Sequence, residues 1–240
     1  MILIGLDDTD IIDHPGTNQL ARHIVYALDG EFHGRMIVRH QLFFDPRVPY
    51  TSKNGSASIH LEPRGTMPLA MLINRLRTLI TDWSPAGSDP GFCVTEQVPA
   101  EITQYARRCQ HELITQQEAR LLAAEHEIHL EGLGGTEGGV IGALAAVGLA
   151  ATRESGRIVH LHPVKRDLYE VTGRMPIREL AEYGIEAVVS SDTKKVITRG
   201  QIDVGKRLRP NLCDRQIVLY AEPAAEHWSE EDCFRAVKVV

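Results

Sequence analysis

The feature that most restricts the fold is a short apolar segment followed at once by a cluster of acids. Residues 2–6 are apolar, and Asp7, Asp8 and Asp10 come directly after them. An apolar run of this length that ends in turn-forming residues is typical of a buried strand. Residues 17–28 then carry apolar side chains at four-residue spacing, which indicates one face of a helix. The chain therefore begins with a strand, an acidic loop and a helix, so we expect helices packed on a sheet.

The same alternation of strands and helices continues along the first two-thirds of the chain. Further strands are predicted at residues 35–44, 57–61, 91–96 and 127–133. Further helices are predicted at residues 68–83, 99–110, 115–126 and 140–151. The last helix follows a glycine-rich turn, residues 134–139, and consists mostly of small apolar residues. We predict an α/β fold in which residues 1–152 form a layered α/β domain.

A polar segment, residues 152–156, is the predicted boundary to a second domain. Beyond it, short strand candidates at residues 157–161, 187–190, 195–198 and 216–221 surround one predicted helix at 176–183. We expect residues 153–240 to form a small α+β domain, for which a ferredoxin-like fold is one option.

Composition excludes several classes of protein. The four cysteines of the 240-residue chain lie far apart, which argues against a structural zinc site and favours buried free thiols. The longest apolar stretch, residues 140–151, is too short to cross a bilayer. The N-terminus lacks the features of a secretory signal, so we expect a cytoplasmic protein without membrane contact. Net charge is −6, and any contact with RNA would have to be local, through the seven basic residues among 194–215.

The acidic turn is the first candidate site. Asp7, Asp8 and Asp10 follow the first strand, at the edge where open α/β sheets bind ligands. Oxygen ligands suit Mg²⁺ that carries substrate phosphates. In an extended backbone Asp8 and Asp10 would share one face of the strand. The alternative is that these acids and Thr9 only satisfy the amides of the turn and of the helix start.

Three further segments have two interpretations each. Thr17 stands at a helix start, where its hydroxyl could lie beside a bound anion or could simply cap the helix. The turn at Lys53, Asn54 and Gly55 could bring a lysine to a phosphate or be an ordinary exposed hairpin turn. The glycine-rich turn at 134–139 could cradle a phosphate, or the small residues after it could serve only close packing on the sheet. His160 and His162 would share a face of a strand, but two histidines do not make a metal site.

Taken together, several motifs resemble the archaeal tRNA-isoleucine 2-agmatinylcytidine synthase family over residues 1–152. They are GLDDTD at 5–10, PGTN at 15–18, DPRVPYTSKNGSA at 45–57, DPG at 89–91 and GGVIGALAAVG at 138–148. The resemblance implies a kinase-like domain that binds ATP and Mg²⁺. In that family the enzyme phosphorylates a cytidine of the anticodon during conjugation with agmatine.

The resemblance also implies roles for single residues. Asp7, Asp8 and Asp10 would bind the metal ion, and Thr17 would be the threonine that becomes phosphorylated, so that Asp8 and Thr17 are the expected catalytic residues. The nucleotide would be bound by two loops, whose residues are Lys53, Asn54 and Gly55 in the first and Gly138, Gly139 and Gly142 in the second.

The chain departs from the family at several of these positions. The family's two-threonine signature reads Thr17-Asn18 here, and its preceding cysteine is Gly16. Its Lys-Thr-Arg motif is replaced by residues 51–53, and the basic residue of its last glycine loop by Glu137. Residues after 157 match the family's ferredoxin-like domain poorly. No counterpart of its oligonucleotide-binding or zinc-ribbon domain is found, so we expect no strong binding of tRNA.

Two functions remain open from the sequence. The first is an ATP- and Mg²⁺-dependent kinase or ligase that acts on an unidentified small-molecule acceptor, or less readily on RNA through residues 194–215. The second is a nucleotide-binding regulatory or partner module without catalysis, which the replacement at Glu137 makes credible. The acceptor and the oligomeric state are not encoded in any motif.

Overall fold

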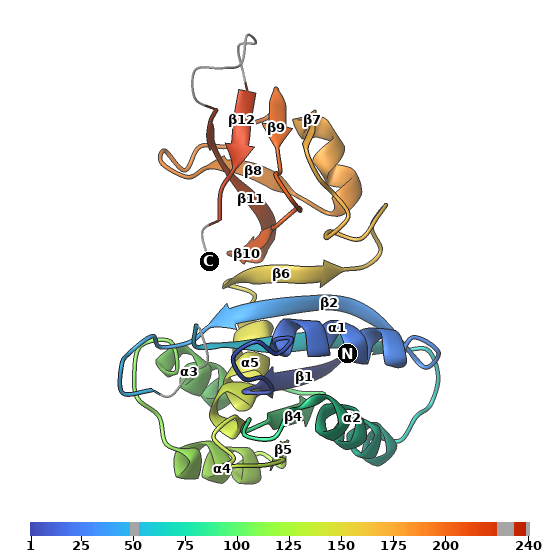
Figure 1. Ribbon diagram of the computed structural model, residues 1–240, viewed down its shortest axis with the longest axis vertical. Helices are drawn as coiled ribbons and strands as arrows, with labels where there is room; N and C mark the ends of the chain where they lie inside the picture. The colour runs from blue at the N-terminus through green and yellow to red at the C-terminus, as the bar shows by residue number, and fades with distance from the viewer. Residues whose placement is uncertain (49–52, 225–232, 239–240) are drawn as a thin grey trace. The chain divides into compact units, whose positions relative to one another are not determined.

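The computed structural model describes residues 1–48, 53–224 and 233–238. The chain divides into two compact units, residues 1–152 and 153–240 (Figure 1). Among the described helices, none is long and apolar enough to cross a membrane.

The first unit is built on a sheet in which every neighbouring pair of strands is antiparallel. In spatial order the strands are β5 (His129–Gly132), β4 (Gly91–Thr95), β1 (Ile2–Asp7), β3 (Gly55–Pro63) and β2 (Phe32–Gln41). The predicted strands of this unit are thus present. Because they are not parallel, the argument from the ligand-binding edge of open parallel sheets does not apply to this fold.

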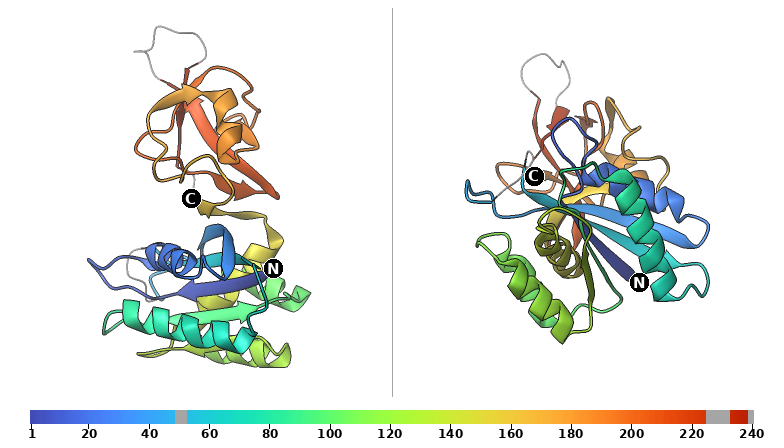
Figure 2. Two further views of the ribbon diagram at one scale, coloured as in Figure 1. Left: turned by 90° about the vertical axis from the view of Figure 1, so that its right-hand side faces the viewer. Right: turned by 60° about the horizontal axis from the view of Figure 1, so that its bottom comes forward.

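Helices cover both faces of this sheet (Figure 2). They are α1 (Thr17–Ala27), α2 (Leu69–Trp83), α3 (Ala100–Arg108), α4 (Gln116–Glu125) and α5 (Val140–Thr152). Leu3 of β1 belongs to the core cluster of α3, α4 and α5, whereas the alternating side chains of Ile4 and Leu6 point to the opposite face, towards α1 and α2. The mixed α/β fold predicted from the sequence is confirmed.

Helix α5 is buried on all sides and lies unusually close to the sheet. A Cβ atom added to Gly5 of β1 would be 1.9 Å from the carbonyl oxygen of Ala143, and one added to Gly148 would be 2.6 Å from the carbonyl oxygen of Ile102 in α3. Small residues on α5 therefore do serve close packing. The buried hydroxyl of Tyr105 donates to the carbonyl oxygen of Ile141 at 3.1 Å, which fixes the first turn of the helix.

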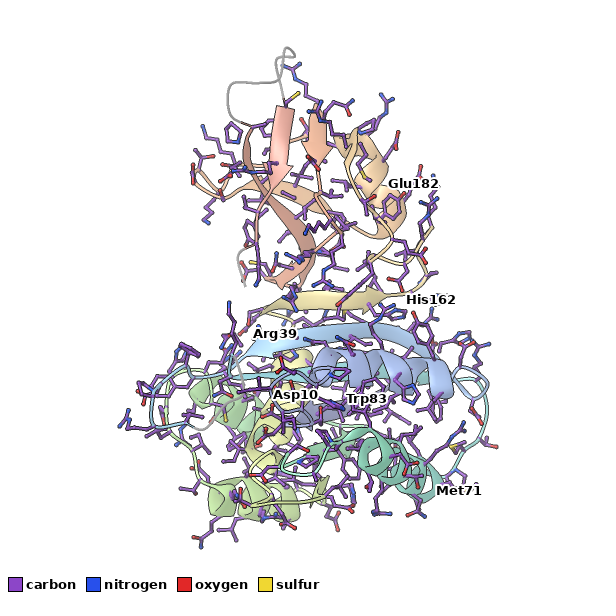
Figure 3. The ribbon with its side chains drawn as sticks, viewed as in Figure 1. Asp10, Arg39, Met71, Trp83, His162 and Glu182 are labelled. Atoms are coloured by element: carbon purple, nitrogen blue, oxygen red, sulfur yellow. The ribbon has the colours of Figure 1, made fainter. Side chains whose placement is uncertain are left out.

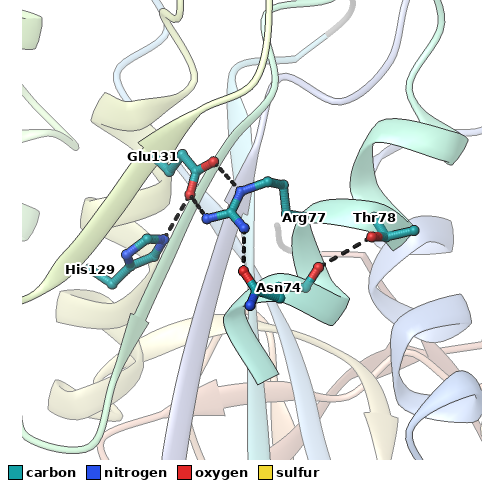
Figure 4. Close-up of polar contacts among 5 residues, drawn as sticks. All are labelled: Asn74, Arg77, Thr78, His129 and Glu131. Carbon is teal, nitrogen blue, oxygen red and sulfur yellow. Dashed lines mark hydrogen bonds and ion pairs between the residues drawn. The ribbon is translucent and has the colours of Figure 1, made fainter. Parts of the chain in front are cut away.

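The edge strand β5 is held to α2 by a polar cluster (Figure 4). Arg77 donates to both carboxylate oxygens of Glu131, at 2.5 and 2.8 Å, and to the amide oxygen of Asn74 at 2.6 Å. His129 lies 3.0 Å from the second carboxylate oxygen of Glu131. These bonds lower the pKa of Glu131, mainly through Arg77. The bidentate pair fixes the position of β5 at the end of the sheet.

The second unit consists mainly of short strands. In spatial order they are β6 (Ser155–Leu161), β10 (Asn211–Cys213), β11 (Gln216–Pro223), β12 (Cys233–Ala236), β9 (Gln201–Asp203) and β7 (Arg174–Pro176). A further strand, β8 (Ala187–Ser190), pairs with β11 in parallel. A 3₁₀ helix spans Ile177–Tyr183 and ends at Gly184, which has a φ of 75°.

Several expectations for the second unit are wrong. The strand expected at residues 195–198 is reduced to a single bridge between Val189 and Val196, and the expected helix is a 3₁₀ helix. The described residues of this unit contain no α-helix, so they do not form the two-helix ferredoxin-like pattern. Strand β6 ends at Leu161, so His162 lies beyond the strand and does not share a strand face with His160.

Candidate nucleotide-binding site

The predicted site residues meet at one end of the first unit's sheet. The register pairs Leu6 with Ala57 and Asp7 with Gly91, so the end of β1 lies beside the beginnings of β3 and β4. Gln41 at the end of β2 pairs with Gly55 at the beginning of β3. The first turns of α1 and α5 approach the same end. The antiparallel order thus gathers residues that are distant in sequence.

Asp7 is the innermost carboxylate of the site. Its Oδ2 atom lies against the first turn of α5, where a Cβ added to Gly142 would be only 1.8 Å away. Burial raises the pKa of Asp7 to about 8, and the charges of Asp8 and Asp10 add to this effect, while that of Arg39 opposes it. The side chain therefore sits where negative charge is poorly compensated.

Asp8 leaves the strand direction. Its φ of 54° places it in the left-handed region, so the extended backbone ends at Asp7 and the predicted sharing of a strand face by Asp8 and Asp10 is wrong. The pKa of Asp8 is raised to about 6, first by burial and then by the charges of Asp89 and Asp10. Asp89, just before β4, thus belongs to the same acidic cluster.

Thr17 is tied into the acidic turn. The residue that caps α1 is Gly16, and Thr17 is the first residue of the helix, so the interpretation of Thr17 as the helix cap is wrong. The buried hydroxyl of Thr9 donates to the hydroxyl of Thr17 at 3.1 Å. Thr17 in turn is hydrogen-bonded to Asp10, whose pKa is raised by burial and lowered by His14 and by this bond. A chain of hydroxyls therefore ends on the Asp10 carboxylate.

Asp89 also organises the glycine-rich turn. Its carboxylate accepts from the amide and the hydroxyl of Thr136, at 2.8 and 2.5 Å, and its carbonyl oxygen accepts from the Gly139 amide at 3.1 Å. A Cβ at Gly138 would meet no atom closer than 3.4 Å, so a side chain there would be in ordinary van der Waals contact. Glu137 forms an ion pair with Arg120.

Arg39 of β2 was not singled out from the sequence. The residue is 8% exposed, and its Nη2 atom donates to the amide oxygen of Gln41 at 3.0 Å. A Cβ at Gly55 would lie 2.5 Å from Nη2, so the glycine leaves room for the guanidinium to pass over β3. The only signal in the sequence is a basic residue directly after the apolar residues 36–38 of a predicted strand, since basic residues are rarely buried without a function or partner.

The loop at residues 53–55 has a different role from the glycine-rich turn. Asn54 donates to the carbonyl oxygen of Phe43 at 2.7 Å and accepts from the side chain of Gln41 at 2.6 Å, so it braces the strand ends. Lys53 is exposed. The replaced motif residues Thr51 and Ser52 lie outside the described residues.

The site's donor set fits Mg²⁺ that is shared with phosphates. No three His, Cys, Asp or Glu side chains among the described residues are grouped as ligands of one metal ion. Mg²⁺ commonly uses one or two carboxylates and completes its shell with water and phosphate oxygens. Asp7 and Asp8, whose charge is poorly compensated, are the residues that would hold it, and a divalent cation would offset their repulsion. Asp10, the third expected ligand, is instead hydrogen-bonded to Thr17.

Comparison with known proteins finds similarity in solved structures. No protein-family model and no curated protein sequence matches the chain. The complex of TiaS with tRNA(Ile2) and ATP is 22% identical, with a TM-score of 0.52 over 61% of this chain and 36% of that one. Apo TiaS, a tRNA(Ile2) agmatidine synthetase, is 23% identical, with a TM-score of 0.52 over 61% and 35%. The complex of TiaS with tRNA(Ile2), AMPCPP and agmatine is 20% identical, with a TM-score of 0.54 over 90% and 52%.

The chain spans about a third to a half of the length of these structures. The resemblance that the motifs indicated is thereby confirmed at the level of the fold.

Proposed function

We propose that this chain is an ATP- and Mg²⁺-dependent phosphoryl-transfer enzyme, a kinase or a ligase, that acts on a small molecule. The observation that carries the proposal is the placement of Asp7. Its carboxylate is buried against the glycine-containing first turn of α5, beside the carboxylate of Asp8. Without a cation, a buried cluster of acids lowers the stability of the folded state. The N-terminus of the adjacent helix favours anions. The two features together suit a metal ion that carries phosphates.

Different residues around Asp7 would bind the metal ion and the phosphates. Asp7 and Asp8 would hold Mg²⁺, which neutralises phosphate charge when it is bound. The Gly138 amide and the positive end of the α5 dipole would favour the phosphates, whereas the Gly139 amide already donates to the Asp89 carbonyl oxygen. Gly142 leaves the space that Asp7 occupies. Positioning and charge neutralisation of this kind account for most of the catalysis in phosphoryl transfer.

Thr17 is the proposed site of covalent phosphate. Its hydroxyl oxygen would form the new bond to the γ-phosphorus while the bond from phosphorus to ADP breaks. The hydroxyl proton would pass to Asp10, to which Thr17 is already hydrogen-bonded. A raised pKa makes Asp10 a better acceptor of that proton.

The comparisons support nucleotide use, because two of the TiaS structures contain ATP or AMPCPP. An RNA acceptor is the less favoured alternative. Two basic residues of the 194–215 segment lie over aromatic rings, Lys194 over Tyr220 at 5.4 Å and Arg207 over Tyr169 at 4.3 Å. These contacts hold the two side chains against rings of the second unit, which restricts their reach towards RNA phosphates.

A regulatory module that binds nucleotide without catalysis is the second candidate. Glu137 stands where the resembling family has a basic residue, and its ion pair with Arg120 gives the acid a structural role. The two candidates share the binding step and differ in whether phosphate is released or transferred.

Calorimetric titration with ATP, with and without Mg²⁺, tests the shared step. We expect binding that depends on Mg²⁺ and that weakens at least about tenfold in Asp8→Asn, since asparagine tolerates a positive φ but cannot neutralise the ion. Asp29→Asn is the control, because Asp29 is an exposed residue at the other end of α1. No binding by the unaltered chain, or equal binding by Asp8→Asn, would refute the proposal. Release of γ-phosphate separates the enzyme from the regulatory module.

A further inference from the structure

Arg39 is a buried cation with few partners. Its guanidinium keeps a full charge at all relevant pH values and carries several N–H donors in a fixed plane. Among the described residues, Gln41 provides its hydrogen bond, and no carboxylate lies within ion-pair distance. A buried charge that is left so incompletely paired lowers stability. The molecule thus retains an unfavourable group at the end of β2.

The surroundings of Arg39 hold it in one position. Gln41 donates in turn to the carbonyl oxygens of Leu42 and Asn54, at 3.0 and 2.6 Å, so the amide that accepts from Arg39 is itself fixed. Gly55 supplies the space beneath Nη2. The nitrogens without a partner are not sealed from solvent. The guanidinium is therefore preorganised and able to receive a ligand.

The open side of Arg39 belongs to the candidate site. The strand register places the ends of β1 and β2 on either side of the beginning of β3, and Arg39 and Asp10 lie toward the same end of the sheet (Figure 3). The register pairs Arg39 with Ala57 and Ala57 with Leu6, so the Arg39 side chain lies on the α1 face of the sheet, the face on which the acidic turn connects β1 to α1.

We propose that Arg39 binds the terminal phosphate of the nucleotide and so selects triphosphates over monophosphates. This inference rests on the proposed function and assigns a residue to it. A fixed guanidinium can bind two oxygens of a phosphate at once. The glycine-rich turn has no free cation for this purpose, because it provides amides and the ion-paired Glu137. Arg39 thus supplies a cationic contact from β2 instead of from that turn.

The test compares Arg39→Gln with Arg35→Gln. Arg35 lies on the same strand and is ion-paired with Glu62, so its loss controls for removing an arginine from β2. Titrations with ATP, ADP and AMP in the presence of Mg²⁺ give the three affinities. In Arg39→Gln we expect ATP affinity to fall about 10- to 100-fold and AMP affinity to change less than about threefold. Arg35→Gln should bind all three as the unaltered chain does.

Arg39→Lys keeps the charge without the planar pair of donors, and we expect an intermediate loss of ATP affinity. It also serves if Arg39→Gln fails to fold, which thermal melting detects. Equal losses for ATP and AMP, or no loss for either, would overturn the role of Arg39 while the proposed function stands. An unaltered chain that binds no nucleotide would overturn both.

Discussion

Replacing Asp7 by asparagine should make the nucleotide-free protein more stable while removing its ability to bind Mg²⁺ and ATP. Asparagine has nearly the same shape as aspartate, so the contact with the first turn of α5 is kept. What changes is the charge, which burial and the neighbouring acids disfavour in the folded state. A buried charge that lowers the free energy of unfolding is expected at a site whose function is to bind a cation.

The size of the effect follows from the pKa. The pKa of Asp7 is raised from 3.8 to about 8 on folding. At about 1.4 kcal/mol for each pKa unit, the cost of the ionised carboxylate reaches at most about 6 kcal/mol. Local relaxation and entry of water reduce such costs, so we expect Asp7→Asn to raise the free energy of unfolding by about 2–3 kcal/mol. In urea this corresponds to a midpoint higher by about 1 M.

The pH dependence has a defined sign. Below about pH 4 Asp7 is protonated in both the folded and the unfolded chain, and the variant and the unaltered protein should be equally stable. Between about pH 4 and 8 the unfolded chain releases the proton and the folded chain keeps it, so the unaltered protein loses stability as pH rises. Above about pH 8 the difference between the two should stay constant.

The assay is urea unfolding followed by circular dichroism at several pH values, in buffer with EDTA. The described α-helices all belong to the first unit, so the helical signal reports that unit. Asp29→Asn again serves as the control. A variant no more stable than the unaltered protein at pH 8, or a difference that is the same at pH 4 and pH 8, would refute the reasoning.

Two more substitutions test the packing around the site. Gly142→Ala should lower the free energy of unfolding by about 1–3 kcal/mol and weaken nucleotide binding, because its Cβ would overlap the Asp7 carboxylate. Gly138→Ala is the control and should change stability little. Equal melting temperatures for the two variants would contradict this. Thr17→Ala should cost about 1–3 kcal/mol by leaving the buried Thr9 hydroxyl without its acceptor, and should abolish phosphate incorporation from ATP, whereas Thr17→Ser should retain it. Mass spectrometry of protein incubated with Mg²⁺ and ATP checks this, and phosphate still gained by Thr17→Ala would exclude Thr17 as the acceptor.

Local patterns in the sequence were sufficient for the elements of the first unit. Strand β1, the acidic turn and helix α1 follow from the apolar segment, the three acids and the four-residue spacing after them. The small residues of α5 indicated close packing. The structure agrees, because a Cβ added to Gly5 of β1 or to Gly148 of α5 would overlap the backbone of a neighbouring helix. Such elements are determined by residues close to one another in the sequence, so the periodicity of apolar residues predicts them.

The second unit was less predictable. Its strands β7, β9, β10 and β12 have three or four residues each, too few to establish a period. Their pairing partners lie far away in sequence, as for β12 and β9. Such strands depend on tertiary pairing more than on their own composition.

Only the tertiary structure decided how the site is assembled. The direction of the strands brought Arg39 and Gly55 to the end of β1. The residues around Arg39 in the sequence do not predict that it lies at the same end of the sheet as the acidic turn. The cap of α1 fell on Gly16, which left the Thr17 hydroxyl for Thr9 and Asp10. The pKa of Asp7 likewise depends on α5, more than a hundred residues away in sequence. Burial and charge act through space, so their effect on a residue is set by which distant segments pack against it.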